Sequence, residues 1–370
     1  MHRLTVVQLL PALQSGGVER STLEIAQALV RAGHRAVVVS AGGRLVPRLL
    51  DSGAEHLTLD IGRKSLWTLR HVPALRRLFA ELGADIVHAR SRLPAWLAWY
   101  ALRGMPQARR PRFVTTVHGL NSPGRYSAVM TYGERVICVS RTVHDYVLQH
   151  YPATTPDKLR TIARGVDMAQ FPRRLRPDPR ARAWAATQVP GLTADDALLL
   201  LPGRGTRLKG HADGLRLLAD LRAQGRAARL WLPGAREEGR AEYLRELEAE
   251  AVQLGVADAV VFTPPTDRIA EAYAASDLVL QLSRKPEAFG RTVVEALAVG
   301  RPVLGWRHGG VGELLDELQP AGAVAPFDAA ALARAAASLL DRPPPPPARI
   351  AYTLQAMQAD TLKVYDELRR

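Results

Sequence analysis

Short runs of aliphatic and β-branched residues alternate along the chain with longer stretches in which apolar residues recur every three or four positions. The short runs predict strands and the longer stretches predict amphipathic helices. In the first half we expect strands at residues 4–10, 35–39, 85–88, 113–117 and 135–139, and helices at 19–32, 65–82, 94–102 and 141–150. Alternation of this kind is typical of a parallel sheet covered by helices.

The same alternation restarts in the second half of the chain. Strands are expected at residues 197–201, 228–232, 259–262, 278–281 and 302–305, and helices at 210–224, 237–254, 268–274, 292–299 and 329–340. The pattern therefore predicts two α/β domains, each doubly wound and Rossmann-like, that face a central cleft.

Proline-rich segments mark the boundaries between these parts. Pro172, Pro177, Pro179 and Pro190 cluster where the alternation stops, which predicts a linker over residues 173–192. The N-terminal domain is then expected at residues 1–172 and the C-terminal domain at 193–345. A last helix, within residues 350–370, follows five prolines and is expected to pack back on the first domain.

Composition excludes several classes of protein. The chain has 370 residues, of which 47% are hydrophobic, and its only cysteine is Cys138. A single cysteine allows neither a disulfide framework within the chain nor a cysteine zinc site. No run approaches the ~18 apolar residues of a spanning helix, and the N-terminus lacks the organisation of a signal peptide. We therefore expect a cytoplasmic protein.

The net charge of +14 is concentrated in the first half, because residues 1–170 carry +12 and residues 171–370 carry +2. Such a field attracts polyanions, including nucleic acid, an anionic membrane face or a phosphorylated acceptor. Binding of single-stranded nucleic acid usually interleaves basic and aromatic residues. The basic segments lack that pattern apart from Trp96, Trp99 and Tyr100, whose helical spacing indicates packing, so no nucleic-acid partner is expected.

Two acidic residues of the second half, Glu287 and Glu295, form its most informative motif. They flank Phe289 and Gly290, a turn that precedes an apolar helix. The start of a helix leaves N–H groups that attract phosphate, and carboxylates accept hydrogen bonds from sugar hydroxyls. This combination favours a site for a nucleotide sugar.

Two glycine-containing loops follow predicted strands and precede predicted helices. After residues 197–201, Arg204 and Lys209 place two cations where they could neutralise a diphosphate. In the first half, Gly16 and Gly17 allow backbone amides to approach a ligand closely. No Asp-x-Asp motif is present, so the usual means of holding a divalent ion against a diphosphate is missing and no metal is expected.

His118 ends a strand of the first half and should lie at the carboxyl edge of its sheet. A neutral histidine there can donate or accept a hydrogen bond with a sugar hydroxyl. Arg90 and Arg92 follow a neighbouring strand that contains His88, and they are candidates for holding an anionic acceptor.

The motifs as a whole resemble those of the retaining glycosyltransferases of family 4, which have the GT-B architecture. The segment from Glu287 to Glu295 is similar to the E-x7-E element of that family, and the segment from Gly203 to Gly210 resembles its phosphate loop. Arg164-Gly-Val-Asp167 resembles the family's Asn-Gly-Ile/Val-Asp stretch, with Arg164 in place of the asparagine. The segment 85–150 looks closest to enzymes of lipopolysaccharide-core and envelope polysaccharide assembly.

The resemblance implies a role for each matching residue. Arg204 and Lys209 would bind the donor diphosphate, Glu287 would bind donor-sugar hydroxyls with the amides of Phe289 and Gly290 nearby, and Glu295 would hold the ribose. His118 would contact the sugar ring, and Gly16 and Gly17 would approach the phosphates. The implied reaction is a retaining, metal-independent transfer without a cofactor, from a nucleotide-diphosphate sugar to an anionic glycolipid or oligosaccharide such as lipopolysaccharide core. Contact with the cytoplasmic face of the inner membrane would follow.

Two alternatives stay open at this point. One is a nucleotide-sugar epimerase of the same two-domain shape, which needs an acid/base set around the sugar. The other is a non-enzymatic polyanion-binding protein, which the high isoelectric point of about 10.5 favours.

Overall fold

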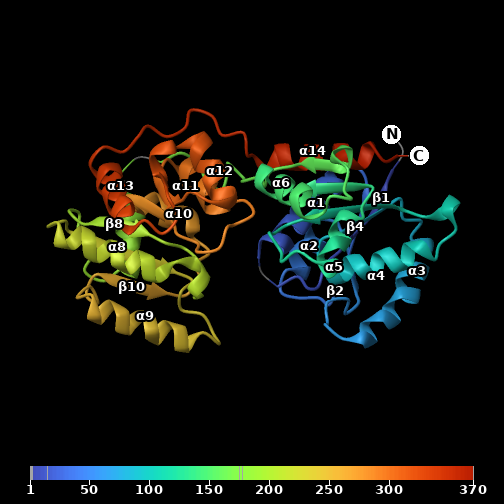
Figure 1. Ribbon diagram of the computed structural model, residues 1–370, viewed down its shortest axis with the longest axis horizontal. Coiled ribbons are helices and arrows are strands. Elements are labelled where there is room, and N and C mark those ends of the chain that lie inside the picture. The colour runs from blue at the N-terminus through green and yellow to red at the C-terminus, as the bar shows by residue number, and fades with distance from the viewer. Residues whose placement is uncertain (1–2, 15, 175, 177, 370) are drawn as a thin grey trace. The chain divides into compact units, whose positions relative to one another are not determined.

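The computed structural model describes residues 3–14, 16–174, 176 and 178–369 (Figure 1). The chain divides into two compact units, one formed by Met1–Gly165 with Leu354–Arg370 and the other by Val166–Thr353. Each unit is built on a parallel sheet with helices around it, as the alternating pattern predicts.

The described residues of the first unit contain a seven-stranded parallel sheet in the order β3-β2-β1-β4-β5-β6-β7. Its strands are β1 (Thr5–Leu9), β2 (Arg35–Ser40), β3 (Glu55–Thr58), β4 (Ile86–Ala89), β5 (Arg112–Val117), β6 (Arg135–Cys138) and β7 (Leu159–Thr161). Its α-helices are α1 (Gly17–Arg31), α2 (Val46–Asp51), α3 (His71–Glu81), α4 (Arg92–Arg103), α5 (Arg125–Ala128), α6 (Arg141–His150) and α14 (Leu354–Asp366).

The described residues of the second unit contain a six-stranded parallel sheet in the order β10-β9-β8-β11-β12-β13. Its strands are β8 (Ala197–Leu200), β9 (Ala228–Pro233), β10 (Val260–Thr263), β11 (Leu278–Gln281), β12 (Val303–Trp306) and β13 (Ala323–Val324). Its α-helices are α7 (Pro179–Gln188), α8 (His211–Ala223), α9 (Ala241–Gln253), α10 (Ile269–Ala275), α11 (Arg291–Val299), α12 (Gly309–Leu318) and α13 (Ala329–Asp341).

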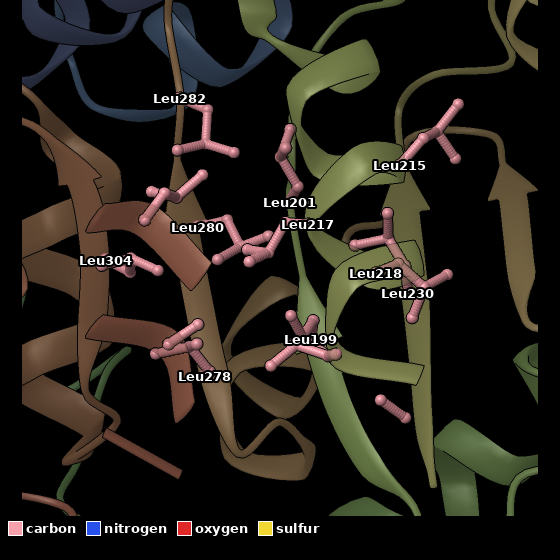
Figure 2. Packing of buried hydrophobic residues seen from close by; sticks show 14 of the residues in the cluster. Leu199, Leu201, Leu215, Leu217, Leu218, Leu230, Leu278, Leu280, Leu282 and Leu304 are labelled. Atoms are coloured by element: carbon pink, nitrogen blue, oxygen red, sulfur yellow. The ribbon is translucent and has the colours of Figure 1, made fainter. Parts of the chain in front are cut away.

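Leucines fill much of the core of the second unit. Because successive side chains of a strand point to opposite faces, Leu278, Leu280 and Leu282 all face one side of the sheet. Figure 2 shows them packing with Leu304 of β12 and with the leucines of β8 and α8. Helix α8 is thereby held against the strands, and the loop that precedes it is fixed at the carboxyl end of β8.

In each sheet the strand order reverses once, and this reversal positions the candidate site. The reversal lies between β1 and β4 in the first unit and between β8 and β11 in the second. Loops that leave two neighbouring strands at such a point run in opposite directions and leave a crevice between them, which is where doubly wound sheets bind ligands.

Residues 173–192, expected to be a linker, contain helix α7. The Asp178 side chain accepts a hydrogen bond of 2.9 Å from the Ala181 amide at the helix start. Pro179 occupies the first turn, where its missing N–H costs nothing. Arg182 of this helix bonds Asp277 at 3.0 Å within the second unit. Proline therefore begins a helix within the segment that the proline pattern predicts to be a linker.

The C-terminal helix α14 packs against α1 in the first unit. Arg31 of α1 donates a hydrogen bond of 2.7 Å to Gln358, and Met357 and Tyr365 lie in the core of this unit. The last helix thus belongs to the helical layer and core of the first unit, although about 190 residues of the second unit separate it from the rest of that unit in sequence.

Candidate functional site

Two loops meet at the reversal of the second sheet, one after β8 and one after β11. The Arg284 amide donates a hydrogen bond of 2.9 Å to the Leu208 carbonyl and joins the loops. Gly210 has φ of 75°, and a Cβ atom added to it would lie 1.9 Å from the Leu282 carbonyl oxygen. Only glycine allows this left-handed conformation and this approach, so Gly210 fixes the position of the preceding Lys209.

Lys209 and Glu287 form an ion pair between these two loops. Lys209 Nζ lies 2.6 Å from Glu287 Oε1, and the two side chains are 29% and 24% exposed. Ser283 donates to the same carboxylate at 2.5 Å, and Gln281 donates to its other oxygen at 3.3 Å. The residues that the sequence predicted for diphosphate and for sugar hydroxyls therefore lie together.

Two opposing effects set the protonation state of Glu287. Burial raises the pKa of Glu287, but the charge of Lys209 and the hydrogen bonds from Lys209, Ser283 and Gln281 lower it by more. The net pKa lies below the ordinary value of a glutamic acid, so the group is an ionised carboxylate at neutral pH. An ionised carboxylate only accepts hydrogen bonds, which suits it to hydroxyl donors.

The turn that carries Glu287 rests on the start of helix α12. The Gly310 amide donates a hydrogen bond of 2.7 Å to the Glu287 carbonyl, and His308 Nε2 lies 2.8 Å from the Ser283 carbonyl. Added Cβ atoms at Gly309 and Gly310 would lie 2.6 Å from the Glu287 oxygen and 2.4 Å from the Phe289 oxygen. This support was not predicted from the sequence, although the Gly309-Gly310 pair after a predicted strand is a recognisable signal.

Phe289 and Gly290 connect this turn to helix α11. The Phe289 side chain is buried and makes an edge contact with Tyr352, with ring centroids 5.7 Å apart. Gly290 caps α11 with φ of 115°, and no side chain caps that helix start. The start of α11 carries the positive end of the helix dipole, which is suited to an anion.

Glu295 lies one turn into α11 and is only 6% exposed. It accepts a hydrogen bond of 3.0 Å from the Tyr273 hydroxyl of α10, and Arg291 lies 3.9 Å from its other oxygen. This carboxylate is thus held inside the second unit, and its expected contact with ribose stays a prediction.

Of the basic residues in the loop after β8, Arg204 is available to a ligand. Its side chain is exposed and forms no hydrogen bond or ion pair with another described residue. Arg207, which the loop also offers, turns away to bond Glu246 of α9 at 2.5 Å. The cations that the loop after β8 offers to a ligand are therefore Lys209, already oriented by Glu287, and Arg204.

In the first unit, Gly16 and Gly17 begin helix α1. Gly16 has φ of 136°, and a Cβ added there would lie 2.7 Å from Glu19 Oε2, whereas one at Gly17 would meet nothing within 4 Å. Both glycines are exposed, and their neighbour Ser15 lies outside the described residues. Their approach to phosphate stays a prediction.

His118 follows β5 and lines a cavity of about 250 Å³. Its Nδ1 accepts a hydrogen bond from Arg164, and its Nε2 is buried with no partner in the described part of the chain. Burial lowers the pKa of His118 far below that of a free histidine, and the charges of Arg164 and Arg90 lower it further. His118 is therefore a neutral imidazole.

Arg90 and Arg92, the neighbouring basic pair, differ in how deeply they are buried. Arg90 is only 3% exposed and donates to Gln8 at 2.5 Å and to Ser21 at 3.1 Å. Arg92 is half-buried, donates to Ser127 at 3.3 Å and lies 5.2 Å from the Tyr126 ring centre. Both line the cavity with His118, but Arg92 is the more accessible of the two.

His88, the other histidine at a strand end, serves the interior of the first unit. Its Nδ1 lies 2.7 Å from the Tyr365 hydroxyl and its Nε2 lies 2.7 Å from Thr116 Oγ1. Both nitrogens are thus occupied in a bridge from β4 to β5 and α14. Within residues 3–14, 16–174, 176 and 178–369, no group of three or more histidine, cysteine, aspartate and glutamate side chains is placed to hold a metal ion.

Comparisons with known proteins agree with this architecture. The sequence model of Glycosyltransferase Family 4 matches residues 15–170, and that of Glycosyl transferases group 1 matches residues 184–356. The D-inositol 3-phosphate glycosyltransferase of Acidothermus cellulolyticus is 32% identical over 219 residues, which cover 58% of this chain and 47% of that protein. The aligned part of this chain thus spans about half the length of such curated relatives.

Solved structures share the fold over nearly the whole chain. A glycosyltransferase from Rickettsia africae superposes with a TM-score of 0.83 at 25% identity, covering 100% of this chain and 99% of that one. Anabaena Alr3699/HepE, in complex with UDP and glucose, superposes with a TM-score of 0.77 at 21% identity, covering 99% and 97%.

Proposed function

Since this chain belongs to the glycosyltransferases of family 4 and has their GT-B fold, we propose that it transfers a sugar from a nucleotide-diphosphate sugar to a cell-envelope acceptor. The observation that carries the proposal is the Lys209–Glu287 pair at the reversal of the second sheet. It joins a cation for the diphosphate to a carboxylate for sugar hydroxyls at the point where doubly wound sheets bind ligands. Anabaena HepE, which has the same fold, is bound to UDP and glucose.

The chemistry we propose is stabilisation of the departing diphosphate by fixed cations. Lys209 has three N–H donors, so it can keep its bond to Glu287 and still bond a phosphate oxygen. Arg204 adds a second charge, and the N–H groups after Gly290 add the positive end of α11. Because Gly210 and Glu287 orient Lys209 before the substrate arrives, little reorganisation is needed as negative charge develops.

We propose retention of configuration and no requirement for a metal ion. In such a transfer a donor phosphate oxygen accepts the proton of the attacking hydroxyl, and protein cations take the role of a divalent ion. Glu287 is suited to orient the sugar, since an ionised carboxylate bonded to Lys209 accepts hydroxyl protons in hydrogen bonds.

For the acceptor we propose an anionic glycolipid or oligosaccharide, and lipopolysaccharide core in particular. Residues 1–170 carry a net charge of +12, which favours a phosphorylated acceptor on this unit. Arg92 and His118 line a cavity of about 250 Å³ that would take a phosphorylated sugar. A second candidate acceptor is a free phosphorylated polyol, which the name of the Acidothermus relative favours.

We also propose a cytoplasmic enzyme that contacts the inner membrane peripherally. No helix in the described chain has the length and apolar character needed to cross a bilayer. Support comes from an aromatic surface formed by Trp96, Trp99, Tyr100, Tyr126 and Tyr132, in which the three tyrosines are at least 40% exposed. Arg92 and Arg103 lie over two of these rings, a combination suited to an anionic headgroup region.

The experiment that tests the transfer has two stages. A thermal-shift screen across nucleotide diphosphates and their sugars identifies the donor, because a ligand that binds only the folded state raises the melting temperature. Turnover is then measured by mass spectrometry with lipopolysaccharide-core acceptors and with phosphorylated polyols. A product formed from donor alone would instead indicate an epimerase, and a salt-dependent shift with DNA in the absence of any nucleotide-sugar binding would indicate a polyanion-binding protein.

A further inference from the structure

Arg164 occupies the position where the glycosyltransferases of family 4 usually have asparagine. Its guanidinium lies against the ring of His118. Arg164 Nη2 donates a hydrogen bond to His118 Nδ1, and Nη1 donates one to Ser21 Oγ. The Met357 sulfur of α14 lies 4.0 Å from Nη1. The side chain is thus held between β5, α1 and α14 within the first unit.

The chemistry of a guanidinium decides which nitrogen of the ring carries the proton. Arginine has five N–H donors and no acceptor. A ring nitrogen that receives one of them must present its lone pair, so Nδ1 is unprotonated. Since burial and the nearby arginines keep the pKa of His118 far below its ordinary value, the ring is neutral and its one N–H is on Nε2.

The Nε2 end of the ring has no partner in the described residues and is buried. A buried donor left without a partner costs about 1–3 kcal/mol, and such groups are few in native proteins. His118 lines the same cavity as Arg92 and Asn121, so a ligand there could supply the missing acceptor. His88 differs, because each of its nitrogens faces a hydroxyl, which can donate or accept.

We propose that Arg164 is a positioning residue that fixes His118 as the Nε2–H tautomer, so that His118 donates a hydrogen bond to a substrate oxygen and does not act as a base. The nature of that substrate rests on the proposed function, whereas the tautomer is a property of the protein alone. An asparagine amide can also be flipped to accept from Nδ1–H, so it does not impose the same choice. Arginine has no acceptor, so it excludes the Nδ1–H tautomer of His118.

The test is a long-range proton–nitrogen NMR spectrum of the full chain with 15N-labelled histidine. His118→Gln identifies the His118 signals among those of the ten histidines. We expect an unprotonated Nδ1 and a protonated Nε2 between pH 6 and pH 8, in more than about tenfold excess over the other tautomer, because the partner is a charged donor. A proton on Nδ1, or comparable amounts of the two tautomers, overturns the proposal without any variant at position 164.

Variants then assign the effect to Arg164. Arg164→Met removes the donors and should give mixed tautomers, whereas Arg164→Lys keeps a cationic donor and should restore the Nε2–H form. Arg92→Met is the matched control. It removes one charge from the same cavity, and Arg92 donates to Ser127 and not to His118. An unchanged tautomer in a folded Arg164→Met protein would contradict the assignment.

Adding a ligand to the NMR sample separates this inference from the proposed function. Adding the nucleotide sugar or acceptor found in the screen should move the Nε2–H signal. If no such ligand moves it, the result counts against the proposed substrate, while the tautomer in the ligand-free spectrum continues to decide the role of Arg164.

Discussion

Replacing Lys209 by alanine separates its part in stability from its part in turnover. The change removes the cation 2.6 Å from Glu287, while Ser283 and Gln281 still donate to that carboxylate. If Lys209 stabilises the departing diphosphate, turnover should fall by ~100-fold or more, as on loss of one preorganised donor to a developing charge. The assay is product formation by mass spectrometry with the donor and acceptor identified in the screen.

The cost in stability follows from the partial burial of the pair. Its side chains are 29% and 24% exposed. The loss should thus exceed the about 0–1 kcal/mol of an exposed pair and fall short of the about 3–5 kcal/mol lost when one partner of a fully buried pair is removed. We expect about 1–3 kcal/mol at pH 7, measured by urea unfolding.

The pH dependence of this loss has a definite sign. The pKa of Glu287 is lowered in the folded wild type, so its contribution to stability is present above the unfolded value of 4.5 and is lost as pH falls through the folded pKa. In Lys209→Ala the Glu287 carboxylate stays buried but loses the charge of Lys209, so the pKa of Glu287 should rise. Above pH 4.5 the ionised, buried carboxylate should then lower the free energy of unfolding. The difference in stability between the two proteins should therefore widen as the pH rises from below 4.5 to 7.

A second substitution distinguishes the two roles. Lys209→Ala with Glu287→Gln removes the stranded charge, so it should recover stability at pH 7 while turnover stays low. Lys363→Ala, an exposed lysine on α14, is the matched control and should change neither quantity. Wild-type turnover in Lys209→Ala would refute the assigned role, and a double variant no more stable than the single one would refute the electrostatic argument.

Three further predictions address the loops, the metal and the membrane. Gly210→Ala should lower the free energy of unfolding in urea by at least about 2 kcal/mol, because the added Cβ would meet a carbonyl oxygen. Gly225→Ala, at a similar φ but with open space around it, should lower it by only about 1 kcal/mol. Equal losses in the two variants would contradict the contact argument. Turnover should persist in EDTA, since the proposed cations are Arg204 and Lys209, and restoration by added magnesium after a complete loss would count against this. In liposome flotation, Tyr100→Ser should reduce recovery with anionic lipid, and equal recovery of the wild type with neutral and anionic lipid would exclude an electrostatic membrane contact.

The strands that could be predicted from the sequence are those buried on both faces. Strand β8 reads Ala-Leu-Leu-Leu and β2 contains three consecutive valines, and such runs are typical of a parallel sheet covered by helices. The edge strand β3 was missed because its sequence Glu-His-Leu-Thr has no apolar run and no fully buried residue. Helix α12 was missed because it begins Gly-Gly-Val-Gly, residues that weaken a helix wherever packing does not compensate for them.

Within the site, sequence could indicate residues that share a sheet edge but not the direction in which each side chain points. Lys209 and Glu287 leave neighbouring strands, so their meeting follows from the topology. Arg90 also leaves a central strand, but its guanidinium turns inward to Gln8 and Ser21. The contact of Arg164 with His118 joins residues 46 positions apart. The local signal in the sequence was an arginine where the glycosyltransferases of family 4 usually have asparagine.

The close approaches around Glu287 explain why so many glycines surround a charged group. Added Cβ atoms at Gly210, Gly309 and Gly310 would lie 1.9, 2.6 and 2.4 Å from backbone oxygens of the loop after β11. A backbone held at three points cannot move its carboxylate far, so Lys209 keeps its orientation without a ligand. Such rigidity costs stability, because each glycine has more freedom to lose on folding than any other residue. A transferase that neutralises a diphosphate with side chains needs their positions fixed beforehand, since a mobile cation would have to reorganise as the bond breaks.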